Sequence, residues 1–269
     1  MTDQWSGHDW VAERRVVVGD DPATVARRVG KRLISKLITL TAARETVHVS
    51  LTGGGAGIAA LRVAAERRDR DDVDWSRVHV WWSDERFVPR ADPERNERQA
   101  REALLDALPL PPENVHAMIA SDAGISAEDA AIAYEHALAA FSCTAPDGAT
   151  QPWPSFDICL LGVGPDAHIA SLFPDRPEIL VTDRAAIAVH DSPKPPPTRV
   201  SLTRPVINAS ERLWLVLTGE EKASALGLAL AGASYASVPA AGAKGRRRTT
   251  FFVDEAAAAQ VPQELIDRG

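Results

Sequence analysis

Short apolar runs alternate along the chain with longer segments in which apolar residues recur at helical spacing. The runs have the length and composition of buried parallel strands. They comprise residues 16–18, 47–51, 78–82, 158–161, 185–189, 213–217 and 249–253, with a further short candidate at 115–118. The intervening segments predict helices at 22–40, 58–68, 93–108, 126–141 and 220–231, and a last helix that begins at Asp254. This alternation predicts a three-layer α/β fold, in which a mainly parallel, Rossmann-like sheet has helices on both faces.

Three of the predicted helices begin with a capping signal. Asp21 and Asp92 each precede a proline, an arrangement that places an N-cap carboxylate before a proline in the first helical position. Ser126 is followed three residues later by Asp129, which is the spacing of a capping box. These signals predict where three of the helices start.

The length of 269 residues fits one large α/β domain over 1–269, with residues 1–12 as a flexible leader. The chain is 45% hydrophobic and 25% charged, which suits a soluble protein with a sizeable core. The net charge of −7 argues against a nucleic-acid or anionic-membrane binder, since both need a basic surface.

No apolar run approaches the length of a membrane-spanning helix, and the first residues lack the pattern of a signal peptide. Cys143 and Cys159 offer neither a disulfide framework nor metal-ligand spacing. We therefore predict a cytoplasmic protein, a monomer, without a metal site and without a membrane or nucleic-acid partner.

Polar or glycine-rich clusters follow four of the predicted strands. They are residues 52–57, 84–86, 162–168 and 219–222. The carboxyl ends of parallel strands lie at one edge of a sheet, where ligands of such folds bind. We therefore expect the four clusters to meet at a single site.

The first cluster contains Gly53, Gly54 and Gly55 directly before a predicted helix. Backbone N–H groups there can approach an anion, and the helix N-terminus adds its positive dipole. The Gly-Lys-Ser/Thr ending of a Walker loop is absent. Taken singly, a tight turn that needs glycine for its backbone angles is the better explanation. Three adjacent glycines directly before a helix nevertheless favour a phosphate-binding loop more than a single glycine would.

The second cluster, Asp84 to Arg86, follows an aromatic strand. The planar fork of Arg86 suits a phosphate because it offers two parallel donors. The alternative is a surface group of charges that pair with one another.

The segment 156–174 carries the strongest candidates for chemistry. A buried strand and a glycine-rich turn are followed by Asp166 and His168, and a histidine beside a carboxylate at a strand end suits proton transfer. From this segment alone, an ordinary Gly-Pro-Asp turn capped by the histidine explains the residues equally well. A formal Gly-x-Gly-x-x-Ala match to the dinucleotide fingerprint is rejected, because Pro165 removes a donor and Asp166 would repel a pyrophosphate.

Two further cations stand near these clusters. Lys222 lies in the first turn of a predicted helix, where it opposes the helix dipole, and this locally unfavourable position hints at function. Arg199 follows three prolines whose fixed φ angles could aim it inward. His48, His79 and His116 show no shared spacing and are expected to be structural or exposed.

Taken in order, the clusters resemble the 6-phosphogluconolactonase family of the pentose phosphate pathway over nearly the whole chain. Residues 51–55 are similar to the family's glycine loop, and 81–89 with Asn96 to its Asp-Glu-Arg motif and following asparagine. Residues 161–174 resemble its Gly-x-Gly-x-Asp-Gly-His-x-Ala-Ser-Leu-Phe-Pro signature. The last two motifs are highly specific, whereas the glycine loop alone is not.

The resemblance implies a cofactor-free enzyme that hydrolyses 6-phospho-D-glucono-1,5-lactone, with His168 as the proton-transfer residue and Asp166 as its partner. The residues it implies for substrate and phosphate binding are Gly53, Gly54, Gly55, Asp84, Arg86, Asn96, Arg199 and Lys222. The chemistry agrees, because a lactone is an activated ester that needs only a base and oxyanion stabilisation.

The chain departs from the family pattern at two places. Gly55-Ala56-Gly57 replaces the usual Ser-Thr-Pro, so a hydroxyl donor near the phosphate is lost. Ala167 replaces the glycine between the aspartate and the histidine. If that position needs a positive φ angle, the alanine costs about 1 kcal/mol.

Two rival functions were weighed. In glucosamine-6-phosphate deaminases, which the family resembles, the segment after the histidine usually reads Ala-Phe-Asn-Glu-Pro. Here residues 170–174 read Ala-Ser-Leu-Phe-Pro, so the glutamate for ring opening is missing.

A non-catalytic sugar-phosphate sensor would need a partner or DNA-binding module, and no segment is spare for one. Ser171 also lacks the nucleophile-elbow pattern of serine hydrolases. The lactonase is favoured.

Overall fold

A computed structural model describes residues 13–145, 148–262 and 266–267. Its centre is a parallel sheet of seven strands in the order β12-β1-β11-β10-β7-β2-β3. Their bounds are β1 (Glu13–Gly19), β2 (Val47–Leu51), β3 (Val78–Trp82), β7 (Ile158–Gly162), β10 (Arg212–Leu217), β11 (Arg248–Asp254) and β12 (Ile266–Asp267). The predicted α/β fold with a mainly parallel sheet is confirmed; the predicted leader, residues 1–12, lies outside the described residues.

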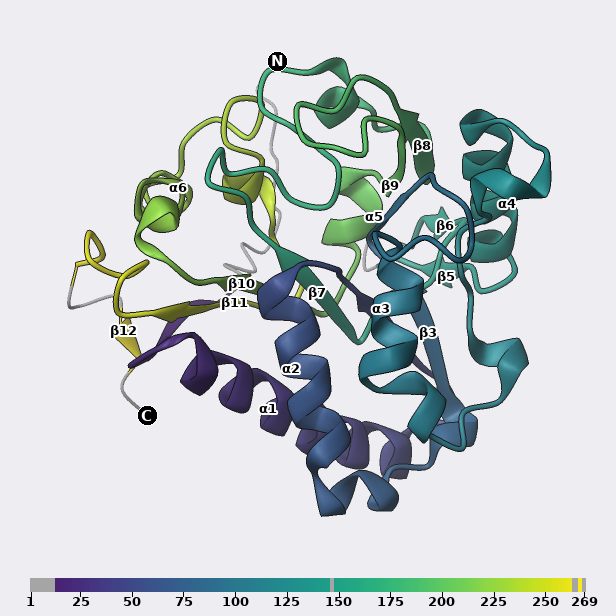
Figure 1. The fold of residues 1–269 in the computed structure, drawn as a ribbon, viewed down its shortest axis with the longest axis horizontal. Helices are drawn as coiled ribbons and strands as arrows, with labels where there is room; N and C mark the ends of the chain where they lie inside the picture. Colours follow the sequence, from purple (N-terminus) through teal and green to yellow (C-terminus); the bar gives the residue numbers. More distant parts are fainter. Residues whose placement is uncertain (1–12, 146–147, 263–265, 268–269) are drawn as a thin grey trace.

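Helices cover both faces of this sheet (Figure 1). Their bounds are α1 (Pro22–Ala43), α2 (Gly55–Glu66), α3 (Asn96–Ala103), α4 (Ala127–Ala139), α5 (Arg204–Asn208) and α6 (Ala223–Leu230). The first three pack on one face and the last three on the other, so the sheet separates two apolar cores. Side chains alternate along a strand, and β7 therefore gives Ile158 and Leu160 to one core and Cys159 and Leu161 to the other.

A small antiparallel sheet lies beside the carboxyl edge of the main one. Its order is β4-β9-β8, with β4 (Asp84–Arg86), β8 (Ala186–Val189) and β9 (Arg199–Leu202). Arg86 of β4 is paired in register with Arg199 of β9, although the two are far apart in sequence. The sequence predicted the strand at β8 but none at β9. A separate two-stranded ribbon joins β5 (Cys143–Thr144) and β6 (Thr150–Gln151).

The capping predictions have mixed outcomes. The Asp21 carboxylate accepts the N–H of Thr24 at 2.6 Å, and Ser126 Oγ accepts the N–H of Asp129 at 3.0 Å, so both caps are confirmed. The start at Asp92 is wrong, because α3 begins only at Asn96. Its N-terminus is capped instead by Glu85, whose carboxylate accepts the N–H of Asn96 at 2.7 Å.

Three further element predictions are corrected. Residues 115–118 form no strand, only an isolated bridge from Val115 to Val80. The Ala-rich segment after Asp254 is turns rather than a helix, and the Asp254 carboxylate closes the first turn by accepting the N–H of Ala257 at 2.9 Å. Residues 220–222 form a single 3₁₀ turn before α6, so Lys222 stands at the N-cap of that helix.

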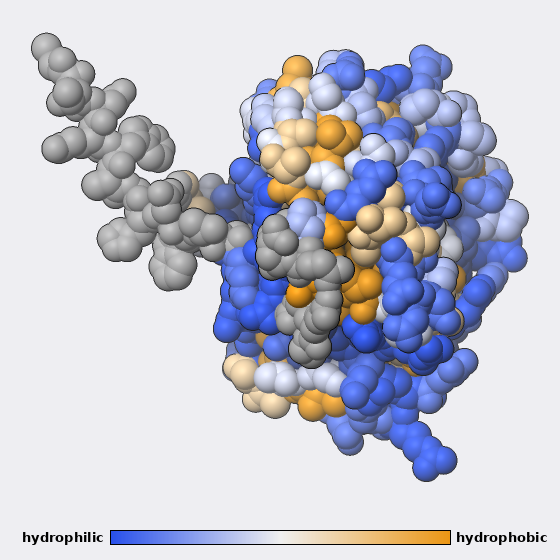
Figure 2. Space-filling view, turned by 90° about the vertical axis from the view of Figure 1, so that its left-hand side faces the viewer, coloured by the Kyte–Doolittle hydropathy of each residue, from blue (hydrophilic) through white to orange (hydrophobic). Residues whose placement is uncertain are grey.

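On the face shown in Figure 2, hydrophobic residues gather in a central band that hydrophilic residues surround. No helix among residues 13–145, 148–262 and 266–267 is long and apolar enough to cross a membrane.

Candidate active site

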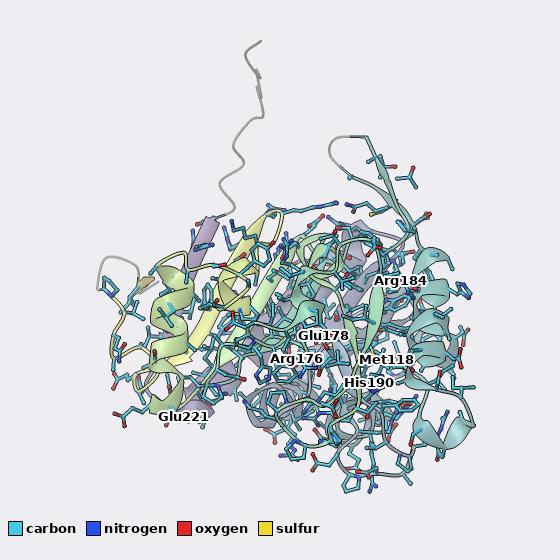
Figure 3. The ribbon with its side chains drawn as sticks, turned by 90° about the horizontal axis from the view of Figure 1, so that it is seen from above. Met118, Arg176, Glu178, Arg184, His190 and Glu221 are labelled. Atoms are coloured by element: carbon cyan, nitrogen blue, oxygen red, sulfur yellow. The ribbon has the colours of Figure 1, made fainter. Side chains whose placement is uncertain are left out.

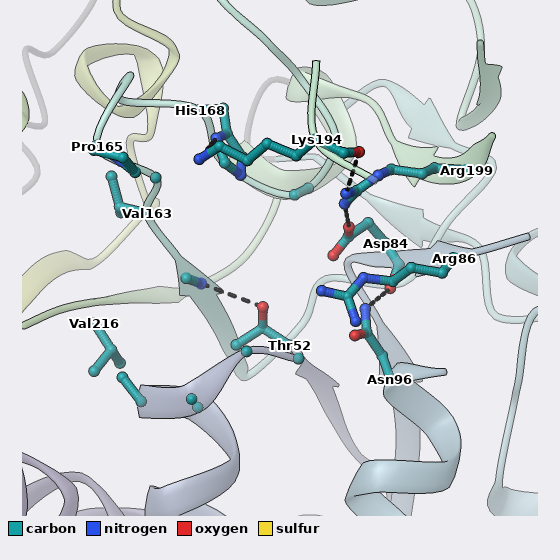
Figure 4. Close-up of a pocket in the computed structure, with 18 of the residues that line it drawn as sticks. Thr52, Asp84, Arg86, Asn96, Val163, Pro165, His168, Lys194, Arg199 and Val216 are labelled. Carbon is teal, nitrogen blue, oxygen red and sulfur yellow. Dashed lines mark hydrogen bonds and ion pairs between the residues drawn. The ribbon is translucent and has the colours of Figure 1, made fainter. Parts of the chain in front are cut away.

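A pocket at the carboxyl edge of the parallel sheet brings all four sequence clusters together, as expected (Figure 4). The predicted residues that line it are Gly53, Gly54, Gly55, Asp84, Arg86, Asn96, His168, Arg199 and Lys222. Asp166 is not a lining residue, but its carboxylate contacts the ring of His168, which lines the pocket. Lys194 also lines the pocket, and the sequence did not predict it as a site residue.

His168 is half-buried at the end of the turn that follows β7. Its Nδ1 atom lies 2.6 Å from Oδ1 of Asp166. An ionised Asp166 accepts the Nδ1 proton, so the second ring nitrogen, Nε2, is left with a free lone pair. Partial burial works to raise the pKa of Asp166, but the hydrogen bond and charge of His168 and the charge of Lys194 outweigh it and hold that pKa well below its usual range. The pair is therefore an orienting carboxylate and a candidate base.

The turn that carries this pair is tightly specified. The N–H of Gly164 donates to the carbonyl of His168 at 3.0 Å, and the N–H of Ala167 donates to the carbonyl of Gly164 at 2.9 Å. A Cβ atom on Gly164 would lie 2.1 Å from Nδ1 of His168, so only glycine fits there. Ala167 has a φ of 65°, in the left-handed region where a side chain is costly and glycine is favoured.

The side chain of Phe173 forms the floor under the histidine. The ring centroids of His168 and Phe173 are 4.6 Å apart, and Phe173 is 1% exposed. An apolar ring thus packs against the imidazole of His168.

Asp84 and Arg199 are both buried on the side of the pocket formed by the small sheet. Ser171 Oγ donates to Oδ2 of Asp84 at 2.8 Å, and Nη1 of Arg199 lies 3.7 Å from the same oxygen. Nε of Arg199 donates to the carbonyl of Pro196 at 3.1 Å, and Nη2 to that of Lys194 at 3.0 Å. Most of the N–H groups of Arg199 are therefore already hydrogen-bonded within the protein.

Arg86 and Asn96 line the opposite side of the pocket from His168 (Figure 4). Nη1 of Arg86 donates to the carbonyl of Glu94 at 2.6 Å, while its buried Nε has no protein partner. Nδ2 of Asn96 donates to the carbonyl of Asp84 at 2.8 Å, and its buried Oδ1 has no protein partner either. Buried polar atoms are rarely left unpaired, so both are candidates to contact a ligand.

Two further sources of positive charge meet the pocket. Helix α2 begins at Gly55, so its first-turn N–H groups and the positive end of its dipole face the cavity. Lys222 is half-buried, and burial lowers its pKa; the charge of Lys194 acts in the same direction, while Glu221, Asp254 and Asp166 oppose it. Among residues 13–145, 148–262 and 266–267, no three His, Cys, Asp or Glu side chains are grouped to hold a metal ion.

The fold and the pocket define an α/β protein that can bind an anionic small molecule beside a histidine–aspartate pair. Residues 20–252 match the family described as glucosamine-6-phosphate isomerases/6-phosphogluconolactonase. The chain is 49% identical to the 6-phosphogluconolactonase of Streptomyces coelicolor, over 93% of this chain and 96% of the relative. It is 46% identical to that of Mycobacterium tuberculosis, over 90% of this chain and 96% of the relative. The chain belongs to this family, so the resemblance predicted from its motifs is confirmed.

Solved structures agree. The 6-phosphogluconolactonase of Thermotoga maritima superposes with a TM-score of 0.76 at 26% identity, covering 90% of this chain and all (100%) of that one. A monomeric glucosamine-6-phosphate deaminase superposes with a TM-score of 0.71 at 16% identity, covering 91% of this chain and 99% of that one. The second likeness concerns the fold alone.

Proposed function

We propose that the protein hydrolyses 6-phospho-D-glucono-1,5-lactone to 6-phospho-D-gluconate, the second step of the oxidative pentose phosphate pathway. The names of relatives at 46–49% identity support this activity. The observation that carries it here is the pairing of His168 with Asp166 at 2.6 Å in a pocket that otherwise presents glycine N–H groups and cations. We also propose, from the sequence, a cytoplasmic monomer that needs neither metal nor cofactor.

His168 acts as a general base on water in this proposal. As the water oxygen bonds to the lactone carbonyl carbon, Nε2 of His168 takes one of its protons and the carbonyl oxygen becomes an oxyanion. Asp166 keeps the proton on Nδ1 and stabilises the imidazolium that forms. Collapse of the tetrahedral intermediate breaks the bond to the ring oxygen, which receives the proton from His168. The carboxylic acid product then loses its own proton to solvent.

The phosphate binds on the far side of the pocket in this proposal. The phosphate is carried on C6, outside the ring that contains the lactone carbonyl, so with the carbonyl at His168 we place the phosphate toward Arg86 and the N-terminus of α2. Gly53, Gly54 and Gly55 offer N–H donors and the helix dipole there, while the guanidinium of Arg86 offers charge.

The remaining predicted residues support this geometry in different ways. Lys222 lines the pocket and adds a cation for the anionic substrate. Asp84 and Arg199 serve mainly to position their neighbours, because their side chains are buried and engaged with Ser171 and with the carbonyls of residues 194–196. Asn96 fixes the backbone at Asp84 and offers its free Oδ1 to the substrate.

The direct test is a lactonase assay on the purified protein. The unstable lactone is generated in place by a glucose-6-phosphate dehydrogenase, and 6-phosphogluconate is detected by its own dehydrogenase, with spontaneous hydrolysis subtracted. We expect the protein to accelerate the lactone step, and to release no ammonia from glucosamine 6-phosphate. Ammonia release without lactone hydrolysis would favour the deaminase and contradict the proposal.

A further inference from the structure

The proline-rich segment 192–197 is held rigidly over the pocket. Ser192 Oγ donates to the carbonyl of Lys194 at 2.9 Å and accepts the N–H of Lys194 at 3.3 Å. The N–H of Ser192 also donates to the carbonyl of Pro197 at 2.9 Å. Nη2 of Arg199 adds bonds to the carbonyls of Lys194 and Pro195, at 3.0 and 3.2 Å. The backbone of Lys194 is therefore fixed in place before any ligand binds.

The chain that leads into this segment is anchored as well. Arg176 donates to the carbonyl of His190 at 2.7 Å and to that of Asp191 at 3.0 Å. Figure 3 shows Arg176, His190 and the Arg176 partner Glu178 close together. Both ends of the segment are thus tied to the body of the protein, which limits how far Lys194 can move.

From this anchored backbone the side chain of Lys194 extends to His168 (Figure 4). Its Nζ lies 3.4 Å from Oδ1 of Asp166 and 3.5 Å from Nδ1 of His168. The ammonium is therefore on the Nδ1 side of the ring, whereas the proposed water binds at Nε2. This places Lys194 at the reacting end of the pocket, behind the base rather than next to the water.

The charges around His168 come from several elements. Asp166 comes from its own turn, Lys194 from the segment 192–197, and Lys222 from the turn before α6. Arg199 lies behind the aromatic floor, with its Cζ 5.8 Å from the centroid of the Phe173 ring. A carboxylate alone would favour an imidazolium, which is no base, and cations oppose that effect.

We propose that Lys194 is an electrostatic positioning residue for the base: its ammonium keeps Asp166 ionised and disfavours the protonated form of His168. This inference rests on the proposed function, which assigns His168 as the base. Because Lys194 and Asp166 are both charged around neutral pH, the ring keeps its Nδ1 proton directed at Asp166 and its Nε2 lone pair available for water.

The substitution Lys194→Met tests this because methionine keeps most of the length of the side chain and removes the charge. We expect the acid limb of the pH profile of kcat/KM to move to higher pH by about one unit, while activity above the new limb stays close to wild type. One unit below the new limb, the variant then loses on the order of tenfold in kcat/KM relative to its plateau. Lys194→Arg restores the charge and returns the limb toward its original position. Lys31→Met, on the exposed face of α1, is the matched control.

A second readout does not depend on which substrate is turned over. The imidazole resonances of His168, assigned by their loss in His168→Ala, are titrated by NMR in the ligand-free protein. We expect His168 to take up its proton at higher pH in Lys194→Met than in wild type, even if the lactonase assay fails. An unchanged or lower titration midpoint, or a higher KM at every pH with an unmoved acid limb, would overturn the inference and make Lys194 a substrate ligand instead.

Discussion

Oδ1 of Asn96 occupies the space that a side chain on Gly53 would need. A Cβ atom on Gly53 would lie only 1.7 Å from this oxygen. Asn96 has little freedom to move away, because it is 1% exposed and its Nδ2 donates to the carbonyl of Asp84 at 2.8 Å. The glycine loop and the start of α3 are therefore in direct contact, and this contact shapes the side of the pocket that faces Arg86.

Gly53→Ala should therefore lower activity strongly. The new methyl group must displace Asn96, break its bond to Asp84 and shift the loop that offers N–H groups to the substrate. We expect kcat/KM to fall by about tenfold or more, with the larger part of the change in KM. Gly227→Ala, within α6 and outside the pocket, is the matched control, because the nearest atom to its added Cβ is Oε1 of Gln260 at 3.8 Å. Steady-state kinetics on both variants decide the point: equal activities would show that the contact is unimportant.

Ala167→Gly should not destabilise the protein as an ordinary alanine-to-glycine change does. Ala167 adopts a φ of 65°, which costs a residue with a side chain about 1–2 kcal/mol and glycine nothing. This relief offsets the lost methyl group and the greater freedom of the unfolded chain. Ala225→Gly, within α6, lacks the relief and should lose about 1 kcal/mol. Thermal unfolding of the two variants tests this prediction. An equal fall in Tm for both would show that the φ angle of Ala167 carries no strain.

Three neighbouring histidines predict a loss of stability in acid: His48 in β2, His79 in β3 and His116, whose ring stacks on that of His79. Burial, and then the charges of His79 and His116, lower the pKa of His48 to about 3. Nδ1 of His48 accepts a hydrogen bond from Nε1 of Trp81 at 3.1 Å, which suits the neutral ring. The unfolded chain binds a proton at His48 below about pH 6.5 and the folded chain does not, so stability falls as the pH drops from there toward 3.

Urea unfolding at pH 7.5 and pH 5 measures this effect. His48 alone should account for a difference of about 2 kcal/mol in the free energy of unfolding. In His48→Gln, whose amide oxygen can still accept from Trp81, the difference between the two pH values should shrink. If the variant and wild type lose the same stability on acidification, the effect does not come from His48.

Arg86→Ala should discriminate between phosphorylated and unphosphorylated lactones. A charge-assisted hydrogen bond contributes about 1.5–3 kcal/mol, so the loss of Arg86 should lower kcat/KM for the phosphorylated lactone by roughly 10- to 100-fold. The value for δ-gluconolactone should change little. Arg90→Ala, a nearby exposed position, controls for the general loss of positive charge. Equal losses on the two lactones would remove Arg86 from the phosphate end.

The sequence predicted the main elements because their causes are local. Asp21 and Ser126 cap helices through bonds to residues three positions on, and such spacing is visible in a sequence. The cap of α3 is not visible, because Glu85 reaches it from eleven residues upstream through the fold. Arg199 illustrates the same limit: its place in β9, opposite Arg86, depends on a sheet that forms between distant segments.

The site shows a similar division. The clusters after the strands were recognisable because parallel strands share one carboxyl edge, and the pocket unites them. Lys194 was not predicted, since only the fold shows that its side chain returns to His168. The three histidines had no shared spacing, yet neighbouring strands bring His48 and His79 side by side.

We propose His168 as the base for hydrolysis of the phosphorylated lactone. The most direct test measures the kcat of His168→Ala on 6-phosphogluconolactone at neutral pH, with circular dichroism to confirm that the fold is intact. General-base catalysis contributes about 10²- to 10⁴-fold, and we expect a loss of that size with little change in KM. A folded His168→Ala variant that keeps wild-type kcat would contradict the claim.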